Sequence, residues 1–82
     1  MPNTPAFVGA GMSAIVPNEN ITKGDLSYVL EIFNSFGEVE IVNEKIMSTV
    51  VATSGSSPAY IFILIEAMAE AAVSGGMTRK AA

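Results

Sequence analysis

The sequence predicts an α/β chain in which short strands and one helix, up to about residue 42, are followed by helices alone. Two observations support this class. In the first half, one amphipathic helix lies between two stretches that alternate as strands do, and in the second half helix signals surround a long apolar run. The length of 82 residues allows at most one small domain.

The first half contains the predicted strand–helix–strand unit. Met12–Val16 alternates loosely and is predicted to be a strand, and Glu38–Val42 alternates polar and apolar residues as a half-buried strand does. Between them we predict a helix over Thr22–Phe36, with Thr22 as its N-cap. Gly37 is expected to end this helix in the left-handed conformation. One face of the helix carries an apolar stripe formed by Leu26, Val29, Leu30 and Phe33.

The second half is predicted to contain two helices. Asn43 can cap a helix that runs from Glu44 to about Thr53, and the Ser/Gly-rich stretch Ser54–Ser57 is expected to break it. A long apolar helix is predicted over Pro58–Ser74, because Pro is favoured in a first turn and two glycines follow the last residue.

This long helix predicts association with more protein. It contains five consecutive large apolar residues, which are Ile61, Phe62, Ile63, Leu64 and Ile65. A helix that is apolar on every face must be buried on every face, and 82 residues offer nothing to surround it. We therefore expect further chain or a homo-oligomer formed through residues 58–73. Thr78–Ala82 is predicted to be the start of another helix, as expected for an interior piece of a longer protein.

Composition excludes several kinds of partner and site. The chain has no cysteine and no histidine, so neither a thiolate site nor a histidine base or metal ligand is expected. Its net charge of −4 argues against nucleic acid. The apolar run Pro58–Ile65 is followed by Glu66 and Glu70 and is shorter than the roughly 20 residues of a membrane span. We expect no membrane segment, no signal peptide and a cytoplasmic protein.

Two motifs carry a resemblance to a known family. The segment Ser-Gly-Ser-Ser-Pro-Ala-Tyr at 54–60 and the first six residues, Met-Pro-Asn-Thr-Pro-Ala, stand at compatible spacing. Together they resemble an interior part of pyrroline-5-carboxylate reductases. The resemblance implies that residues 1–42 are the end of a Rossmann-type dinucleotide-binding domain and that residues 43–82 open the helical dimerisation domain.

The resemblance also implies an activity in proline biosynthesis. Such reductases transfer a hydride from NADPH or NADH to 1-pyrroline-5-carboxylate and form L-proline. The segment alone is expected to be inactive and to bind no cofactor, because it has no glycine loop that leads from a strand into a helix. Gly9-Ala10-Gly11 is followed by a predicted strand and Pro17 and therefore does not qualify.

Glu44 is the best candidate for a substrate-binding residue. By resemblance, its carboxylate would hold the cationic nitrogen of the pyrroline ring or of proline. The alternative is that a Glu in a first helical turn complements the helix dipole. Nearby, the family has an acidic residue, a Thr and a Gly where this chain has Ser48, Val51 and Ser57. These departures put the roles of positions 48 and 51 in doubt, whereas Ser57 can still cap a helix before Pro58.

Asn3 and Thr4 are weaker candidates for cofactor contacts. By resemblance, this motif lies near the nicotinamide end of the cofactor. The alternative is a turn braced by Pro2 and Pro5, which favour an extended start.

A second function of another class also fits the sequence. The chain could be a non-catalytic oligomerisation or scaffold module, since it contains no dinucleotide fingerprint and no activated nucleophile.

Overall fold

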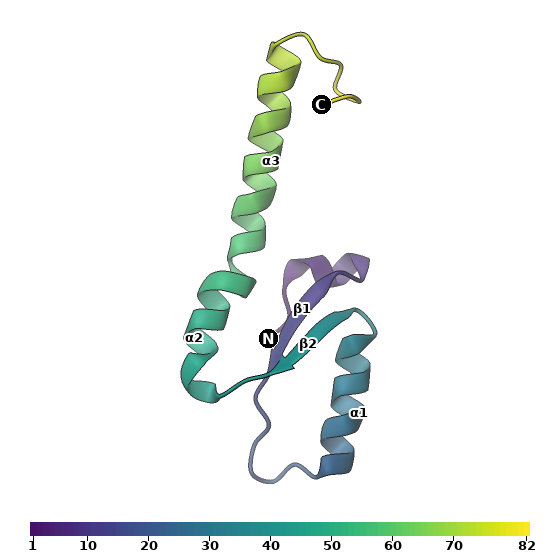
Figure 1. The fold of residues 1–82 in the computed structure, drawn as a ribbon, viewed down its shortest axis with the longest axis vertical. Helices are drawn as coiled ribbons and strands as arrows, with labels where there is room; N and C mark the ends of the chain where they lie inside the picture. Colours follow the sequence, from purple (N-terminus) through teal and green to yellow (C-terminus); the bar gives the residue numbers. More distant parts are fainter.

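The computed structural model describes residues 1–82 and shows a strand–helix–strand unit from which a long helical arm projects (Figure 1). The first part contains a 3₁₀ turn at Thr4–Val8, β1 at Gly11–Ile15, α1 at Lys23–Asn34 and β2 at Gly37–Ile41. The arm contains a 3₁₀ turn at Glu44–Ile46, α2 at Met47–Val50, a π-helical turn at Val51–Gly55 and α3 at Ser57–Ser74. This element order confirms the predicted α/β class.

The two strands pair in parallel and α1 connects them. Their register runs from Gly11 opposite Gly37 to Ile15 opposite Ile41. The predicted cap of α1 is present, because Thr22 Oγ1 accepts a hydrogen bond from the Asp25 N–H at 3.1 Å. The predicted apolar stripe is the half-buried side of α1, whereas most of the other α1 residues are exposed.

The prediction that Gly37 ends the first helix is wrong. The helix ends at Asn34 with Ser35 as its C-cap in the right-handed conformation, and Gly37 is the first residue of β2. Its φ of 156° and its place beside Gly11 require glycine there, because a Cβ atom would lie 2.0 Å from the Gly11 carbonyl oxygen.

The predicted break between the two later helices is a π-helical turn instead of a loop. The Ser56 N–H donates to the Val51 carbonyl at 2.9 Å, so the helical path continues through Ser54 and Gly55. Ser57 is the first residue of α3 and does not act as its cap. The predicted end of α3 at Ser74 is confirmed.

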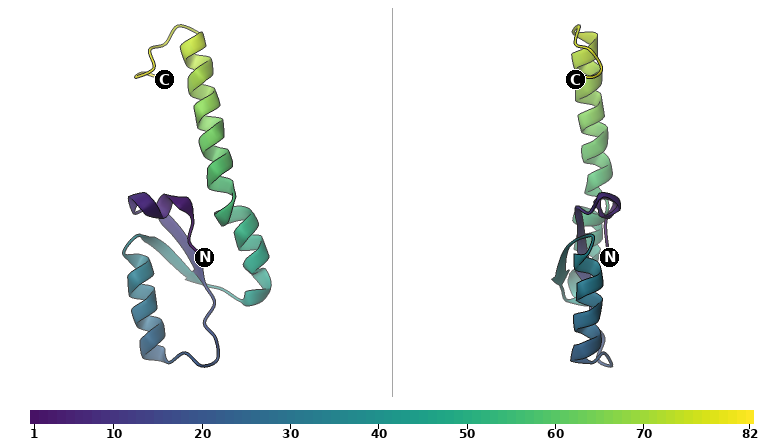
Figure 2. Two further views of the ribbon diagram at one scale, coloured as in Figure 1. Left: turned by 180° about the vertical axis from the view of Figure 1, so that it is seen from behind. Right: turned by 90° about the vertical axis from the view of Figure 1, so that its right-hand side faces the viewer.

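Very little of this chain is buried. Only three residues are buried, and Ser13 and Ala14 are two of them. The radius of gyration is 17.6 Å, whereas a compact domain of this length has about 12 Å. Figure 2 shows from two sides that no element covers α3 over most of its length. The five apolar residues at 61–65 are each 51% to 63% exposed.

The arm is long and apolar enough to cross a membrane. This holds for the helical stretch Glu44–Ser74 by length and composition alone. Core helices of soluble proteins can have the same length and composition, so the absence of a membrane segment stays a prediction.

Candidate functional site

Asn3 lies where the first part of the chain meets the arm. Its side-chain Oδ1 accepts a hydrogen bond from the Met12 N–H of β1 at 2.9 Å. Its Nδ2 donates to the carbonyl oxygen of Ser54 at 3.2 Å and lies 3.3 Å from the Ser54 hydroxyl. The amide of Asn3 therefore spans from β1 to the π-helical turn.

The backbone before Asn3 is held against the outer edge of β1. Met1 accepts a hydrogen bond from the Ala14 N–H at 3.0 Å and donates its own amino group to the Ala14 carbonyl at 2.8 Å. The extended start predicted from the prolines is observed only as far as Asn3, because Thr4 and Pro5 begin the 3₁₀ turn. Proline is compatible with that turn, since its fixed φ suits the first helical positions.

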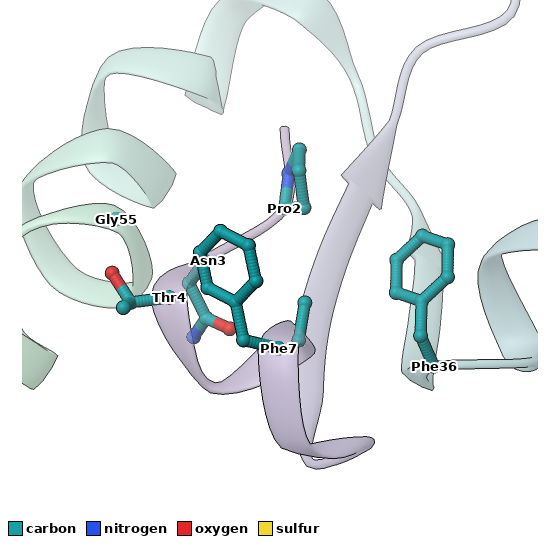
Figure 3. Close-up of a pocket in the computed structure, with 7 residues that line it drawn as sticks. Pro2, Asn3, Thr4, Phe7, Phe36 and Gly55 are labelled. Carbon is teal, nitrogen blue, oxygen red and sulfur yellow. The ribbon is translucent and has the colours of Figure 1, made fainter.

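An open pocket lies beside this motif. It has a volume of about 680 Å³ and is lined by Pro2, Asn3, Thr4, Ala6, Phe7, Phe36 and Gly55. Figure 3 shows Thr4 on the side of the pocket where Gly55 lies. Phe7 is 93% exposed, so its apolar ring lines this pocket with almost no cover from the rest of the chain. The pocket wall thus combines the N-terminal motif with the π-helical turn.

Glu44 stands apart from this pocket. It is the first residue of the arm, and the Asn43 side chain caps its turn by accepting from the Lys45 N–H at 2.9 Å. Glu44 is exposed, its carboxylate has no hydrogen-bond partner within the chain, and it lines no pocket. A single copy of the chain therefore does not bring Glu44 together with Asn3 and Thr4.

The departures from the family pattern lie on the segment between Glu44 and α3. Ser48 is an exposed residue of α2, and Val51 begins the π-helical turn with 41% of its surface exposed. Neither side chain lines a pocket of this structure. No group of three or more Asp or Glu side chains gathers as a metal site would require.

Sequence reasoning missed two members of this site. Ser54 was expected only in a loop, yet its carbonyl and hydroxyl face Asn3. Phe36 was expected only as the end of a helix, yet it lines the pocket with Phe7. No local sequence pattern predicts that Asn3 contacts Ser54, because 51 positions separate the two residues. Phe7 and Phe36 are likewise far apart in the sequence.

Comparison with known proteins links both parts of the chain to one enzyme family. Residues 44–82 match the family model described as pyrroline-5-carboxylate reductase dimerisation. The pyrroline-5-carboxylate reductase of Escherichia coli is 57% identical over 79 residues, which are 96% of this chain and 29% of that protein. The one from Methanosarcina acetivorans is 49% identical over the whole chain and 30% of its own length. The chain thus spans less than a third of the length of these relatives.

Solved structures of pyrroline carboxylate reductases are also similar to this chain. The chain superposes on a pyrroline carboxylate reductase of Plasmodium falciparum, solved with NADP bound, with a TM-score of 0.85 and 40% identity. That match covers 98% of this chain and 33% of the other. The reductase of Coxiella burnetii gives a TM-score of 0.86 with 39% identity, over 99% of this chain and 30% of the other. The similarity therefore includes the strand–helix–strand unit as well as the arm.

Proposed function

Because the chain belongs to the pyrroline-5-carboxylate reductase family, we propose that it forms an interior part of a cytoplasmic reductase that converts 1-pyrroline-5-carboxylate into L-proline. The observation that carries this proposal is the similarity over 96% to 100% of the chain to reductases from several organisms. NADPH or NADH supplies the hydride when it is bound, and the protein supplies binding and orientation.

The two parts of the chain have separate roles in this proposal. Residues 1–42 complete the dinucleotide-binding domain, and residues 43–82 open the dimerisation domain. The start of the family-model match at Glu44 supports that boundary. The exposure of α3 supports a homo-oligomer in which residues 58–73 of one copy pack against another.

The pocket beside Asn3 and Thr4 is the proposed neighbour of the nicotinamide. Thr4 offers a hydroxyl on the pocket wall, and Phe7 and Phe36 offer apolar surface against which a flat ring can pack. Asn3 helps to shape this pocket, because its side-chain amide is hydrogen-bonded to Met12 and Ser54 and holds the pocket wall in place.

Glu44 is the proposed contact for the substrate nitrogen. Its carboxylate is free of partners within the chain, so it is available to a cationic ring. The charge would attract the iminium form of the substrate and orient the imine carbon toward the hydride donor. Because Glu44 lies outside the pocket in one copy, we propose that the complete site needs the rest of the enzyme.

A chimeric enzyme tests this proposal. Residues 1–82 would replace the matching segment of the Escherichia coli reductase, and oxidation of NADPH with 1-pyrroline-5-carboxylate would be followed by absorbance. We expect kcat/KM within about tenfold of the parent, since a few departures in supporting residues cost on the order of 1.4 kcal/mol.

The exposed α3 helix also favours the alternative function, a non-catalytic oligomerisation module. In that case the chimera would fold and assemble like the parent but would not reduce the substrate. The size of the chimera by sedimentation, measured beside its turnover, separates this outcome from simple misfolding.

A further inference from the structure

The joint between the two parts of the chain depends on one side chain. The two contacts from Asn3 Nδ2 to Ser54 are the only hydrogen bonds that join residues 1–42 to residues 43–82. No ion pair crosses this boundary either, since the only ion pair joins Arg79 to Glu70. The same amide is fixed at its other end by the Met12 N–H of β1.

The sequence of the arm explains why Ser54 needs this partner. In an α-helix the carbonyl of residue 54 would accept a hydrogen bond from the N–H of residue 58. Residue 58 is proline and has no N–H. The carbonyl is therefore without its usual helical donor, and Asn3 Nδ2 supplies one at 3.2 Å.

This joint also forms part of the proposed cofactor pocket. Thr4, which follows Asn3, and Gly55, which follows Ser54, lie on the same side of this pocket (Figure 3). Any change in the angle between the two parts moves Gly55 relative to Thr4 and so alters this wall. It also moves Glu44, which is only a few residues from the π-helical turn along the arm.

We propose that Asn3 is a positioning residue of the reductase, which sets the angle between the dinucleotide-binding part and the arm by replacing the missing N–H of Pro58. This inference rests on the proposed function. Asn3 does not have to touch substrate or cofactor in this role. It acts through Ser54 and Met12, and its loss should lower turnover more than it weakens the binding of either ligand.

The test uses the chimera described above with Asn3→Asp. The carboxylate keeps an acceptor for the Met12 N–H but has no donor for the Ser54 carbonyl. We expect kcat to fall about tenfold to a hundredfold, as displacement of reacting groups by about 1 Å does, with KM for NADPH changed less than threefold. Asn20→Asp is the matched control, because Asn20 is exposed and uses only its backbone N–H.

A second substitution separates positioning from stability. Pro58→Ala gives residue 58 an N–H that can bond the Ser54 carbonyl, so it should restore the melting temperature of the Asn3→Asp chimera. It cannot restore the link to β1, so kcat should stay low. Recovery of kcat together with the melting temperature would overturn the proposal and reduce Asn3 to a structural residue.

A distance measurement keeps the test independent of catalysis. The chain has no cysteine, so spin labels can be placed at Tyr28→Cys on α1 and at Met77→Cys just after α3, two exposed sites outside the proposed interface at residues 58–73. Labelled chain diluted with unlabelled chain should give a narrow distance distribution that broadens or shifts with Asn3→Asp. An unchanged distribution would overturn the proposal even if the chimera were inactive, whereas a changed one beside an inactive chimera would count against the proposed function alone.

Discussion

Gly11 and Gly37 face each other at the first position of the parallel sheet, and a Cβ atom on Gly37 would lie 2.0 Å from the Gly11 carbonyl oxygen. The close approach also includes Ala6, whose Cβ lies 2.8 Å from a Cβ built on Gly11. The turn that carries the N-terminal motif thus packs directly on the sheet through glycine. The geometry of the candidate site depends on this contact as well as on Asn3.

We predict that Gly37→Ala destabilises the protein strongly. The added methyl group meets backbone atoms that cannot move aside without breaking the strand pairing, so the cost should be about 2–4 kcal/mol. The melting temperature of the chimera measures it. Gly24→Ala is the control, because it lies in α1 with no atom closer than 3.8 Å to the new Cβ and should stabilise by up to about 1 kcal/mol. Equal melting temperatures for the two variants would contradict the close contact.

Ser13→Ala is predicted to stabilise the protein. Ser13 is 1% exposed, and its hydroxyl has no hydrogen-bond partner. A buried polar group without a partner costs about 1–3 kcal/mol, and alanine removes the hydroxyl while leaving only a small gap. Chemical denaturation should show a gain of about 1 kcal/mol. A loss of stability would mean that the hydroxyl bonds a water molecule or another part of the longer protein.

The features that were predictable from the sequence are those with local causes. The spacing of Leu26, Val29, Leu30 and Phe33 and the cap at Thr22 define α1, because both act within a few residues. The alternation in Glu38–Val42 likewise identified β2 to within one residue at each end.

The features that were missed depend on residues far apart in the chain. Gly37 was assigned to helix termination because its contact with Gly11 has no local signature. Ser54–Ser57 suggested a loop by composition, but a π-helical turn keeps the helical path while Asn3 bonds the Ser54 carbonyl. Whether Glu44, Asn3 and Thr4 contact ligands stays a prediction, since each depends on groups outside residues 1–82.

Glu44→Gln is predicted to weaken substrate use with little effect on the cofactor. Glutamine keeps the shape of the side chain but removes the charge that would face the ring nitrogen. A charged hydrogen bond contributes about 1.5–3 kcal/mol, so kcat/KM for the pyrroline should fall about tenfold or more. The measurement is steady-state kinetics of the chimera with a separate titration of NADPH.

The control for this substitution is Glu31→Gln, an exposed carboxylate of α1 that should change neither constant. If Glu44→Gln left turnover unchanged and lowered the melting temperature, the carboxylate would be serving the helix dipole instead.

The last prediction is that the chain associates with itself through α3. Burying an Ile, Leu or Phe side chain contributes about 1.5–3 kcal/mol, and the residues at 61–65 are more than half exposed in one copy. Neither α1 nor the sheet covers α3, because both lie beyond its N-terminal end in a molecule 59 Å long (Figure 1). A second copy can, and packing of like surfaces gives a closed two-fold dimer. Sedimentation should show a dimer or larger assembly that Ile63→Glu converts to monomer, whereas Tyr28→Glu on α1 should leave it intact. A compact monomer at high micromolar concentration would contradict the prediction, because α3 would then have found its cover within a single chain.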